Sequence, residues 1–502
     1  MILLLFIVII IFSSLSIYII RYLYYYHNKS KIKYYNDNTP CSNSNNKVPF
    51  FYIPSSSSSR NYNEFDTKDP FRNLAKALHQ YQNDVNTFIS SMVFNVEFAR
   101  KTEWIVYNHN NNKHDNKKDE SSSSSSLFSS NLERRIQQIA ELSEKNYFIL
   151  ESLLRPFEFV LGLPNSSFTK KSNDNDDELD RLDLPHYDDN KDTSSTSSSY
   201  DSAMQVITHI VRDWTRLGKG IRINLYDWII KQLLANRNTI NDSSILIPGA
   251  GLGRLASDIA CAGFHVEANE ISIIMAAAAY QILNQNIVGE IYPFVNDHQI
   301  NEVNTMNRYQ KVSFPDNDNN NASCQRQAGS LSYTVGDFIE IFSTNERKEQ
   351  YGALVTCFFI DTASNIYEYL LVIRNVLKNG GLWINVGPLQ WHGNAKLNPS
   401  GDELRMIIES LGFVVHSWVV DEGPLNYRHD DTNELPRYTK FEGYKPLRFV
   451  ATVPSSSASL SIERMHTKKE ICMIRAFFAR NKNHDTSSYC NNIHSDVVIE
   501  EL

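Results

Sequence analysis

Ile245-Leu-Ile-Pro-Gly-Ala-Gly-Leu-Gly-Arg-Leu-Ala256 carries three glycines at alternate positions behind a short apolar run. The run predicts a buried strand, and the residues after the glycines predict the start of a helix. Gly249, Gly251 and Gly253 allow a tight backbone turn and let a ligand approach without meeting a Cβ atom. The free N–H groups at the start of the helix point toward such a ligand. The segment therefore predicts a nucleotide-type binding turn.

The residues around this turn indicate which nucleoside it binds. Glu270 lies 21 residues after Gly249, just beyond a second expected strand at 264–268. A carboxylate at that point can accept hydrogen bonds from the hydroxyls of a ribose. Dinucleotide-binding turns follow the pattern G-x-G-x-x-G, whereas the sixth position here is Arg254. The observed G-x-G-x-G is typical of S-adenosylmethionine sites, which makes S-adenosylmethionine the predicted cofactor, although many glycine turns are purely structural.

Strand and helix signals alternate along this part of the chain, which predicts an α/β fold with a parallel sheet. The run 353–361 reads as a buried strand that ends in an acid, and a helix is expected at 365–377, ended by Asn379-Gly380-Gly381. A further strand is expected at 382–386. Because ligands bind at the carboxyl ends of such strands, the site is expected at that edge. The residues predicted to lie there are Gly249, Glu270, Asp337, Asp361 and His392.

Composition narrows the function classes. The chain has 502 residues, enough for two or three domains, and its hydrophobic content of 42% supports a sizeable core. A net charge of −8 without a basic stripe disfavours nucleic acid as the main partner. Six scattered cysteines without a C-x-x-C pair argue against a metal site or a disulfide framework, and they fit a reducing compartment.

The N-terminus predicts a membrane anchor. Residues 2–20 are almost wholly apolar, and a helix of about 19 residues can just span a bilayer. Arg21 and Lys29 begin a basic stretch, which by the positive-inside rule lies on the cytoplasmic side. No basic residue or small-residue cleavage site marks a cleaved signal peptide. The expected location is therefore a membrane, single-pass, with the catalytic domain in the cytosol; a signal sequence or a gene-model artefact is the alternative.

Polar Ser- and Asn-rich segments divide the rest of the chain, and such segments cannot bury enough apolar area to fold. Between them, Phe71, Leu74, Leu78, Tyr81 and Val85 repeat three or four apart and predict one face of a helix. A second stripe of the same period runs through 132–149. The predicted organisation is a transmembrane anchor at 1–26, a disordered linker at 27–63, a helical region at 64–163 with a Ser/Asn-rich insert at 108–130, an acidic Ser-rich linker at 164–202, the S-adenosylmethionine-dependent domain at 203–454 and a C-terminal tail at 455–502.

Several motifs of the α/β domain occur together. They are Arg212-Asp213-Trp214, Pro248-Gly-Ala-Gly-Leu-Gly-Arg-Leu-Ala256, Asn269-Glu270, Thr356-Cys-Phe-Phe-Ile-Asp-Thr-Ala363, and Trp383-Ile-Asn-Val-Gly-Pro-Leu389 with His392. The set resembles the N2227-like family over about 203–453, and loosely over 64–163. The resemblance implies a class I methyltransferase with a Rossmann-like parallel sheet. It also implies methylation of the imidazole of carnosine (β-alanyl-histidine) to give anserine, with S-adenosylmethionine as cofactor, and a homodimer through the helical region as a partner to test.

The resemblance also implies cofactor-binding residues. Arg212 would meet the carboxylate end of the cofactor, because its planar donors suit a bidentate grip. Gly249 would let the backbone approach the cofactor, and Glu270 would hold the ribose. The family has a glutamine three residues before the arginine, and His209 stands there in this chain. Histidine can donate the same kind of hydrogen bond, but its charge near pH 7 depends on its surroundings.

Three further positions complete the implied cofactor site. Asp337 would bind the amino group of the adenine, and Phe338 would cover its ring face. Cys357 would line the pocket.

The implied substrate contacts are Asp361, His392 and Tyr444, with Tyr438 or Phe441 as alternatives to the tyrosine because the C-terminal match is loose. Asp361 is the catalytic candidate. A carboxylate on the far N–H of the imidazole selects the tautomer and stabilises the imidazolium formed on methylation.

Each of these residues also has an ordinary structural interpretation. Asp361 could be the N-cap of the next helix, and His392 an ordinary loop histidine. Cys357 in an apolar strand is typical of a core, and Arg212 could simply pair with Asp213. At the level of the whole protein, the open alternatives are a methyltransferase of the same fold acting on another amine or a protein histidine, and a catalytically inactive, membrane-tethered binding protein.

Overall fold

An eight-stranded sheet forms the centre of the computed structural model, in the order β1-β6-β3-β2-β7-β8-β12-β9. The described residues are 48–52, 70–111, 128–154, 202–285, 287–296, 304–316, 329–427 and 443–455. The strands of the sheet are β1 (Phe50–Tyr52), β2 (Ser244–Pro248), β3 (His265–Glu270), β6 (Ser330–Val335), β7 (Tyr351–Cys357), β8 (Leu377–Gly387), β9 (Val414–Val420) and β12 (Leu447–Thr452). Two small antiparallel pairs, β4 (Gly289–Ile291) with β5 (Val312–Phe314) and β10 (Leu425–Asn426) with β11 (Gly443–Tyr444), lie outside it.

The sheet is mixed, which corrects the expectation of a purely parallel one. β12 runs antiparallel to both of its neighbours, β8 and β9. The other strand pairs are parallel, from β1 to β8. Among the described elements, only the short strands β10 and β11 lie between β9 and β12 in the chain. Because no crossover helix connects β9 to β12, β12 runs in the opposite direction to β9. The mixed sheet with one reversed strand near its edge is the class I methyltransferase form of the Rossmann-like α/β fold.

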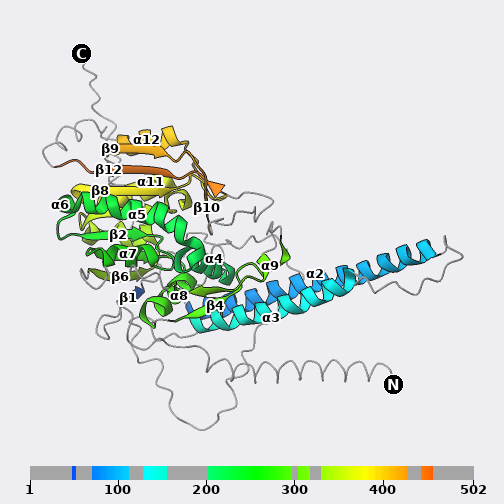
Figure 1. Ribbon diagram of the computed structural model, residues 1–502. Helices are drawn as coiled ribbons and strands as arrows, with labels where there is room; N and C mark the ends of the chain where they lie inside the picture. Colours follow the sequence, from blue (N-terminus) through cyan, green and yellow to red (C-terminus); the bar gives the residue numbers. More distant parts are fainter. Residues whose placement is uncertain are drawn as a thin grey trace, which may run out of the picture.

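Helices cover both faces of the sheet (Figure 1). Ile245 and Ile247 belong to one buried cluster and Leu246 to another, because successive strand residues point to opposite faces. The first cluster includes α4 (Ala203–Trp214), α5 (Lys219–Ala235), α7 (Arg254–Cys261) and α8 (Ile273–Asn284). The second includes α10 (Phe338–Phe342), α11 (Ile366–Val376) and α12 (Gly401–Ser410). Short helices are α6 (Arg237–Ile240), α9 (Thr305–Arg308), η3 (Arg216–Gly218), η5 (Asn345–Arg347) and η6 (Ile360–Thr362).

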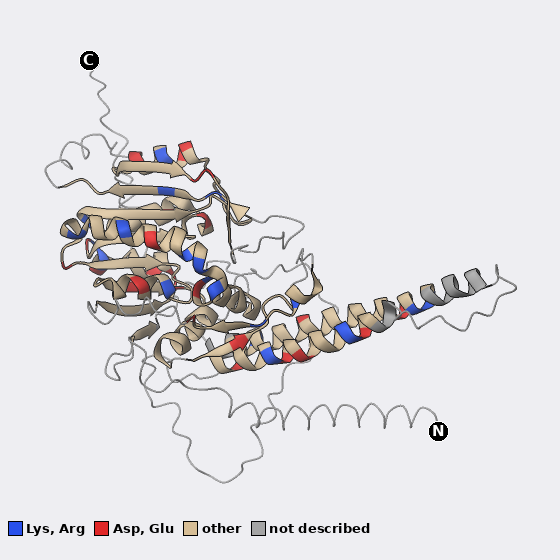
Figure 2. Cartoon of the chain, viewed as in Figure 1, with Lys and Arg blue, Asp and Glu red and all other residues tan. Residues whose placement is uncertain are grey.

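The two predicted N-terminal helices are confirmed as α2 (Pro70–Asn111) and α3 (Phe128–Leu154), which lie side by side and project from the body (Figure 1). The predicted stripe is the buried face of α2, with Leu74, Leu78 and Tyr81 in the core. The Tyr81 hydroxyl accepts a hydrogen bond from Asn296 Nδ2 at 2.7 Å, which fastens α2 to the α/β domain. Figure 2 shows basic and acidic residues interspersed along the described part of this pair.

Strand β1 departs from the expected disordered linker at 27–63. Its three residues pair in parallel with β6 at the edge of the sheet. The backbone of Val48 exchanges two hydrogen bonds with the Asn284 side chain, at 2.7 and 3.0 Å, and the Phe50 ring stacks on Tyr333 with centroids 4.5 Å apart. The linker expectation is therefore wrong for residues 50–52, because apolar and aromatic contacts order them.

The membrane prediction requires a correction. Across the ranges that the structure describes, no helix has both the length and the apolar character needed to cross a bilayer. The long helix α2, for example, carries Glu97, Arg100 and Lys101 within two turns. The expected membrane location is overturned on this finding. The anchor segment 1–26 lies outside the described residues, as do the linker at 164–202 and the tail at 455–502 apart from Ser202 and Ser455.

One cysteine also differs from expectation. Cys261, at the end of α7, is disulfide-bonded, whereas the spacing of the cysteines predicts no disulfide framework. Cys357 is a free thiol.

Candidate active site

The glycine turn after β2 needs glycine for both backbone and space. Gly249, Gly251 and Gly253 have φ values of 64°, 54° and 75°, which side-chain-bearing residues rarely adopt. A Cβ on Gly249 would lie 2.5 Å from Cδ2 of Phe359, and one on Gly251 would lie 3.2 Å from Nδ1 of His209. The backbone of the turn therefore packs directly against the side chains of Phe359 and His209.

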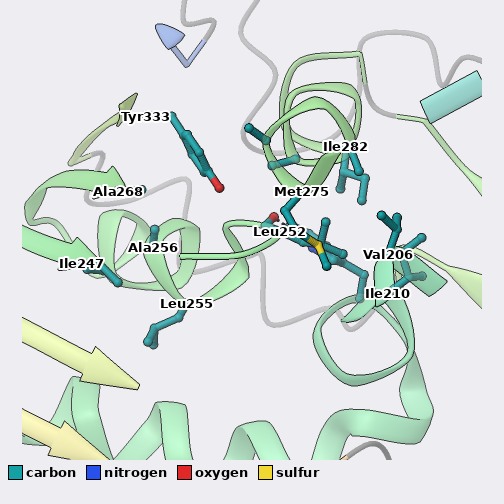
Figure 3. Close-up of a cluster of buried hydrophobic side chains, with 14 of the residues drawn as sticks. Val206, Ile210, Ile247, Leu252, Leu255, Ala256, Ala268, Met275, Ile282 and Tyr333 are labelled. Atoms are coloured by element: carbon teal, nitrogen blue, oxygen red, sulfur yellow. Dashed lines mark hydrogen bonds between the residues drawn. The ribbon is translucent and has the colours of Figure 1, made fainter. Parts of the chain in front are cut away.

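Glu270 holds this turn from the end of the neighbouring strand. Its Oε2 accepts the N–H of Gly251 at 2.8 Å, and its Oε1 accepts the N–H of Ser272 at 2.9 Å. The Tyr333 hydroxyl donates to the carbonyl of Gly251 from the other side. Figure 3 shows the apolar cluster behind the turn, where Leu252 packs with side chains from α4, α7 and α8. A buried carboxylate is thus fixed beside the glycines, where the spacing predicts it.

Arg212, near the end of α4, is a buried cation with an incomplete set of partners. Its Nε and Nη2 donate to the two oxygens of Asp213 at 2.6 and 3.1 Å, and the Tyr226 hydroxyl donates to Oδ1 of the same carboxylate at 2.9 Å. Burial lowers the pKa of Arg212, but Asp213, Tyr427 and Tyr226 together outweigh it and hold that pKa well above its usual value. Among the residues that the structure describes, the buried Nη1 of Arg212 has no hydrogen-bond partner. A buried donor left in this state costs free energy unless a ligand oxygen accepts it.

Aromatic rings surround the same guanidinium. Its centre lies 5.2 Å from the ring of Phe358 and 5.0 Å from the ring of Tyr427. Phe358 has a φ of 55°, an uncommon conformation for a bulky residue, and such strain clusters at functional sites. Neither ring is a site residue in the sequence prediction. Phe358 could have been expected at the site, because it directly follows the strand that ends at Cys357. Tyr427 follows the short strand β10, and no sequence pattern marks it as a site residue.

His209 occupies the space between Arg212 and the glycine turn. Its Nδ1 lies 3.2 Å from Nη2 of Arg212. Burial, and then the Arg212 charge, lower the pKa of His209 to about 3, so the ring is neutral at physiological pH. Because the arginine can only donate, Nδ1 accepts and the ring proton resides on Nε2. The histidine therefore offers an N–H donor, as the glutamine expected at this position would.

Asp361 lies in η6, just after β7, at the same edge of the sheet. The N–H of Gln390 donates to its Oδ2 at 3.1 Å, and its backbone carbonyl accepts the N–H of His392 at 3.3 Å. Burial raises the pKa of Asp361 to about 6, against the smaller opposing effect of backbone hydrogen bonds. It is not the N-cap of the following helix, because Asn365 caps α11. The alternative interpretation of Asp361 as a helix N-cap is therefore excluded.

His392 stands on the loop that follows β8 and is half-buried. Burial lowers the pKa of its imidazole, so the neutral ring is favoured. Its backbone contact with Asp361 brings the two predicted substrate residues together.

The remaining predicted cofactor residues lie at the ends of β6 and β7. Asp337 caps α10 by accepting the N–H of Glu340 at 2.9 Å. The ring of Phe338 is buried, with its centroid 5.3 Å from Phe359 and 5.5 Å from Tyr369, so much of it belongs to the core. Burial raises the pKa of Cys357 to about 12, which keeps this residue a thiol.

Tyr444 on β11 faces the same aromatic group. Its ring lies 5.3 Å from Phe358 and 6.0 Å from Tyr427. Its buried hydroxyl has no hydrogen-bond partner within the described ranges. This hydroxyl and Nη1 of Arg212 are therefore two unsatisfied polar atoms beside the ring of Phe358. The alternatives Tyr438 and Phe441 lie outside the described residues. No three His, Cys, Asp or Glu side chains of the described ranges gather as a metal site would require.

Comparison with known proteins places this arrangement among methyltransferases. A family model described as carnosine N-methyltransferase matches residues 189–444, about half of the chain. A carnosine N-methyltransferase of Drosophila melanogaster is 30% identical over 54% of this chain and 61% of its own length. One from Schizosaccharomyces pombe is 34% identical over 42% of this chain and 60% of its own length. The chain thus spans about three fifths of the length of these relatives.

Among solved structures, a magnesium protoporphyrin IX methyltransferase from Synechocystis PCC 6803 aligns over 51% of this chain and 96% of its own, at 13% identity and a TM-score of 0.31.

Proposed function

Because the chain belongs to the carnosine N-methyltransferase family, we propose that it transfers the methyl group of S-adenosylmethionine to the imidazole of carnosine, giving anserine, with residues 203–454 as the catalytic unit. One observation carries the proposal. A buried arginine with an unsatisfied Nη1 stands beside a glycine turn, and a buried carboxylate, Asp361, lies at the same sheet edge. The first arrangement suits an amino-acid cofactor, and the second suits an imidazole substrate.

The residues present fit this cofactor. Nη1 of Arg212 would donate to its carboxylate end, and the Nε2–H of His209 offers a second donor nearby. Gly249 would let the cofactor lie close to the protein backbone, and Glu270 would accept hydrogen bonds from the ribose hydroxyls. The cofactor supplies a methyl group on a positively charged sulfur. The aromatic rings around Arg212 exclude water, which strengthens electrostatic contacts at the reacting centre.

The adenine end of the proposed site is formed by Asp337 and Phe338. The Asp337 carboxylate would accept from the adenine amino group, and the edge of Phe338 that is not packed in the core would contact the ring. Cys357, held as a thiol, would line the pocket between this end and Arg212.

The proposed chemistry is an in-line displacement. The lone pair of a neutral imidazole nitrogen forms the new N–C bond while the C–S bond breaks, and the electron pair stays on sulfur. The unperturbed imidazole pKa of about 6.5 leaves much of the substrate neutral at pH 7, so no strong base is required. Asp361 would accept the N–H of the other ring nitrogen. This contact selects the tautomer, orients the ring and stabilises the positive charge that the ring acquires.

Release of the proton completes the reaction. The methylated ring is an imidazolium, which loses its N–H proton to return to neutrality. With a pKa of about 6, the Asp361 carboxylate is ionised at neutral pH and is well matched to receive that proton.

His392 and Tyr444 would position the rest of the dipeptide. The Tyr444 hydroxyl is buried and unpartnered, so an amide or carboxylate of the substrate would satisfy it. The neutral His392 ring would donate or accept next to Asp361.

The test is an assay of the full chain with methyl-labelled S-adenosylmethionine and carnosine, with the product ring nitrogen assigned by NMR. We expect methylation at the nitrogen nearer the side-chain attachment. Binding of S-adenosylhomocysteine without carnosine turnover would refute the acceptor and direct the search to other amines or protein histidines. Absence of cofactor binding would refute the enzyme as a whole and favour a binding protein.

We also propose that two copies of the chain pack through α2. Val93, Phe94 and Phe98 are 54%, 72% and 65% exposed, and they lie within two turns of a helix that projects from the body. Light scattering should give the mass of a dimer for the wild-type chain and of a monomer for Phe94→Glu. The equally exposed Met406 on α12 provides the control, since Met406→Glu should leave the dimer intact. A monomeric wild-type chain would refute the proposal.

A further inference from the structure

A buried ion network lies behind the site, outside the residues that face a ligand. Asp316 follows β5, and its carboxylate has no exposed surface. Its Oδ2 pairs with Nη2 of Arg222 on α5, and its Oδ1 accepts Nη1 of Arg254 on α7 at 2.8 Å. Its own N–H donates to the carbonyl of Trp214 at 2.7 Å. Asp316 thus joins α5 and α7 through its carboxylate and the end of α4 through its backbone N–H.

Arg222 fixes the backbone of the arginine that the proposed cofactor needs. Its Nη1 donates to the carbonyl of Arg212 at 2.7 Å and to that of Thr215 at 2.9 Å. These carbonyls lie at the C-terminal end of α4, where the helix itself offers no donors. The chain then passes so close that a Cβ on Gly218 would stand 2.0 Å from the Arg212 oxygen. The backbone at Arg212 therefore has little freedom.

Arg254 connects the same helix end to the glycine turn. Its Nη1 also donates to the carbonyl of Asp213 at 3.2 Å, and its guanidinium lies 5.0 Å from the ring of Trp214. The Trp214 indole N–H donates to the carbonyl of Leu252 within the turn, at 3.2 Å. Arg254 stands where the dinucleotide pattern has a glycine. The same residue connects the glycine turn to α4.

We propose that Asp316 is a positioning residue for cofactor binding, acting through Arg222 and Arg254. It holds the end of α4 against the glycine turn and so directs Nη1 of Arg212 toward the carboxylate end of the cofactor. The inference rests on the proposed function, since it concerns the same cofactor. A long side chain delivers its donor accurately only when its backbone is fixed, and a displacement of about 1 Å can cost about 100-fold.

The experiment compares two ligands of the full chain by isothermal titration calorimetry. S-adenosylhomocysteine has the carboxylate that Arg212 would bind, whereas 5′-methylthioadenosine keeps the nucleoside and the sulfur but lacks the amino-acid end. For Asp316→Asn we expect a loss of about 10- to 100-fold in affinity for S-adenosylhomocysteine and less than about 3-fold for 5′-methylthioadenosine. Equal losses for both ligands, or no loss for either, would overturn the inference.

The matched control is Asp258→Asn. Asp258 also pairs with Arg254, at 2.9 Å, but it is 31% exposed and touches neither Arg222 nor α4 among the contacts of this network. We expect its affinity for both ligands to stay within about 2-fold of wild type, because Asp316 still holds Arg254. A selective loss in this variant equal to that of Asp316→Asn would contradict a special role for Asp316.

A second variant covers the case in which Asp316→Asn does not fold, since it leaves two buried cations short of a partner. Arg254→Gln removes one arm at a site with 15% exposure and should cause a smaller loss, about 5- to 20-fold, that is again selective for S-adenosylhomocysteine. A non-selective change would overturn the inference. Failure of the wild-type chain to bind either ligand would refute the proposed function itself.

Discussion

Arg212 and Asp361 lie at one edge of the sheet, yet the fold treats their charges in opposite ways. Arg212 is paired with Asp213, and its pKa stays well above the usual value. Asp361 is equally buried, but among the described residues its carboxylate meets backbone N–H groups, including that of Gln390, rather than a cation, and burial raises its pKa to about 6. The difference indicates that the first charge is permanent and suits binding, whereas the second can gain or lose a proton and suits the reaction.

The strongest way to break this comparison is Asp361→Asn. Without the carboxylate the imidazole is neither oriented nor stabilised as it becomes positive, so we expect kcat to fall by about 10²- to 10⁴-fold. Affinity for S-adenosylhomocysteine should stay near wild type, since the cofactor is held elsewhere. Steady-state kinetics and calorimetry measure the two quantities. A kcat within about 3-fold of wild type would remove Asp361 from the mechanism.

Arg212→Lys tests the binding role that the comparison gives to Arg212. Lysine keeps the charge but loses the planar pair of donors, so we expect the Kd for S-adenosylmethionine to rise by about 10- to 100-fold. The exposed Arg405, paired with Glu409 on α12, supplies the control, because Arg405→Lys changes the same chemistry far from the site. An Arg212→Lys variant that binds the cofactor as wild type does would mean that the guanidinium serves only structure.

Stability should respond to Asp361 in the opposite sense from activity. The folded pKa of about 6 is above the ordinary aspartate value of 3.8, so the carboxyl contributes stability that is fully present below pH 3.8 and is lost as pH rises through about 6. Asp361→Asn should therefore raise the free energy of unfolding at pH 7.5, by at most about 3 kcal/mol. Urea denaturation of both proteins measures this. A variant less stable than wild type at pH 7.5 would contradict the interpretation that the Asp361 carboxylate is a buried charge without a compensating cation.

The pH profile of kcat separates the two halves further. Because Asp361 must be ionised and the substrate imidazole, with a pKa of about 6.5, must be neutral, kcat should decrease below about pH 6 by about 100-fold per pH unit. Arg212 and its partner do not titrate in this range, so Arg212→Lys should keep the same acid limb. The residual activity of Asp361→Asn should keep only the part of the limb that the substrate imidazole causes, about tenfold per pH unit. An unchanged limb in that variant would assign the titration to another group.

The smallest effect is expected for His209→Gln. The histidine is already neutral, with its pKa lowered to about 3, and it offers one N–H donor, as a glutamine does. We expect the Kd for S-adenosylhomocysteine to change by about 2- to 3-fold only. A large loss would show that the imidazole ring itself, packed against Gly251, shapes the turn.

Sequence reasoning succeeded best where chemistry is local. The glycines were predictable because a tight turn needs positive φ, and Glu270 because its distance along the chain matches one strand–helix–strand unit. The helix expected at 365–377 is confirmed as α11, but the strand expected at 382–386 begins earlier, at Leu377, and includes Asn379-Gly380-Gly381. Within this strand, Gly380 has a φ of 76°.

The fold class, the cofactor turn and the candidates Arg212 and Asp361 follow from short patterns, because each depends on residues within one structural unit. Tertiary packing alone decided the reversed strand β12, the edge strand β1 and the ring of Tyr427 over Arg212. It also decided Asp316, whose partners Arg222 and Arg254 are 94 and 62 residues away. No local spacing encodes such pairs, since a carboxylate finds its arginine only after the sheet has brought distant segments together and removed water from between them.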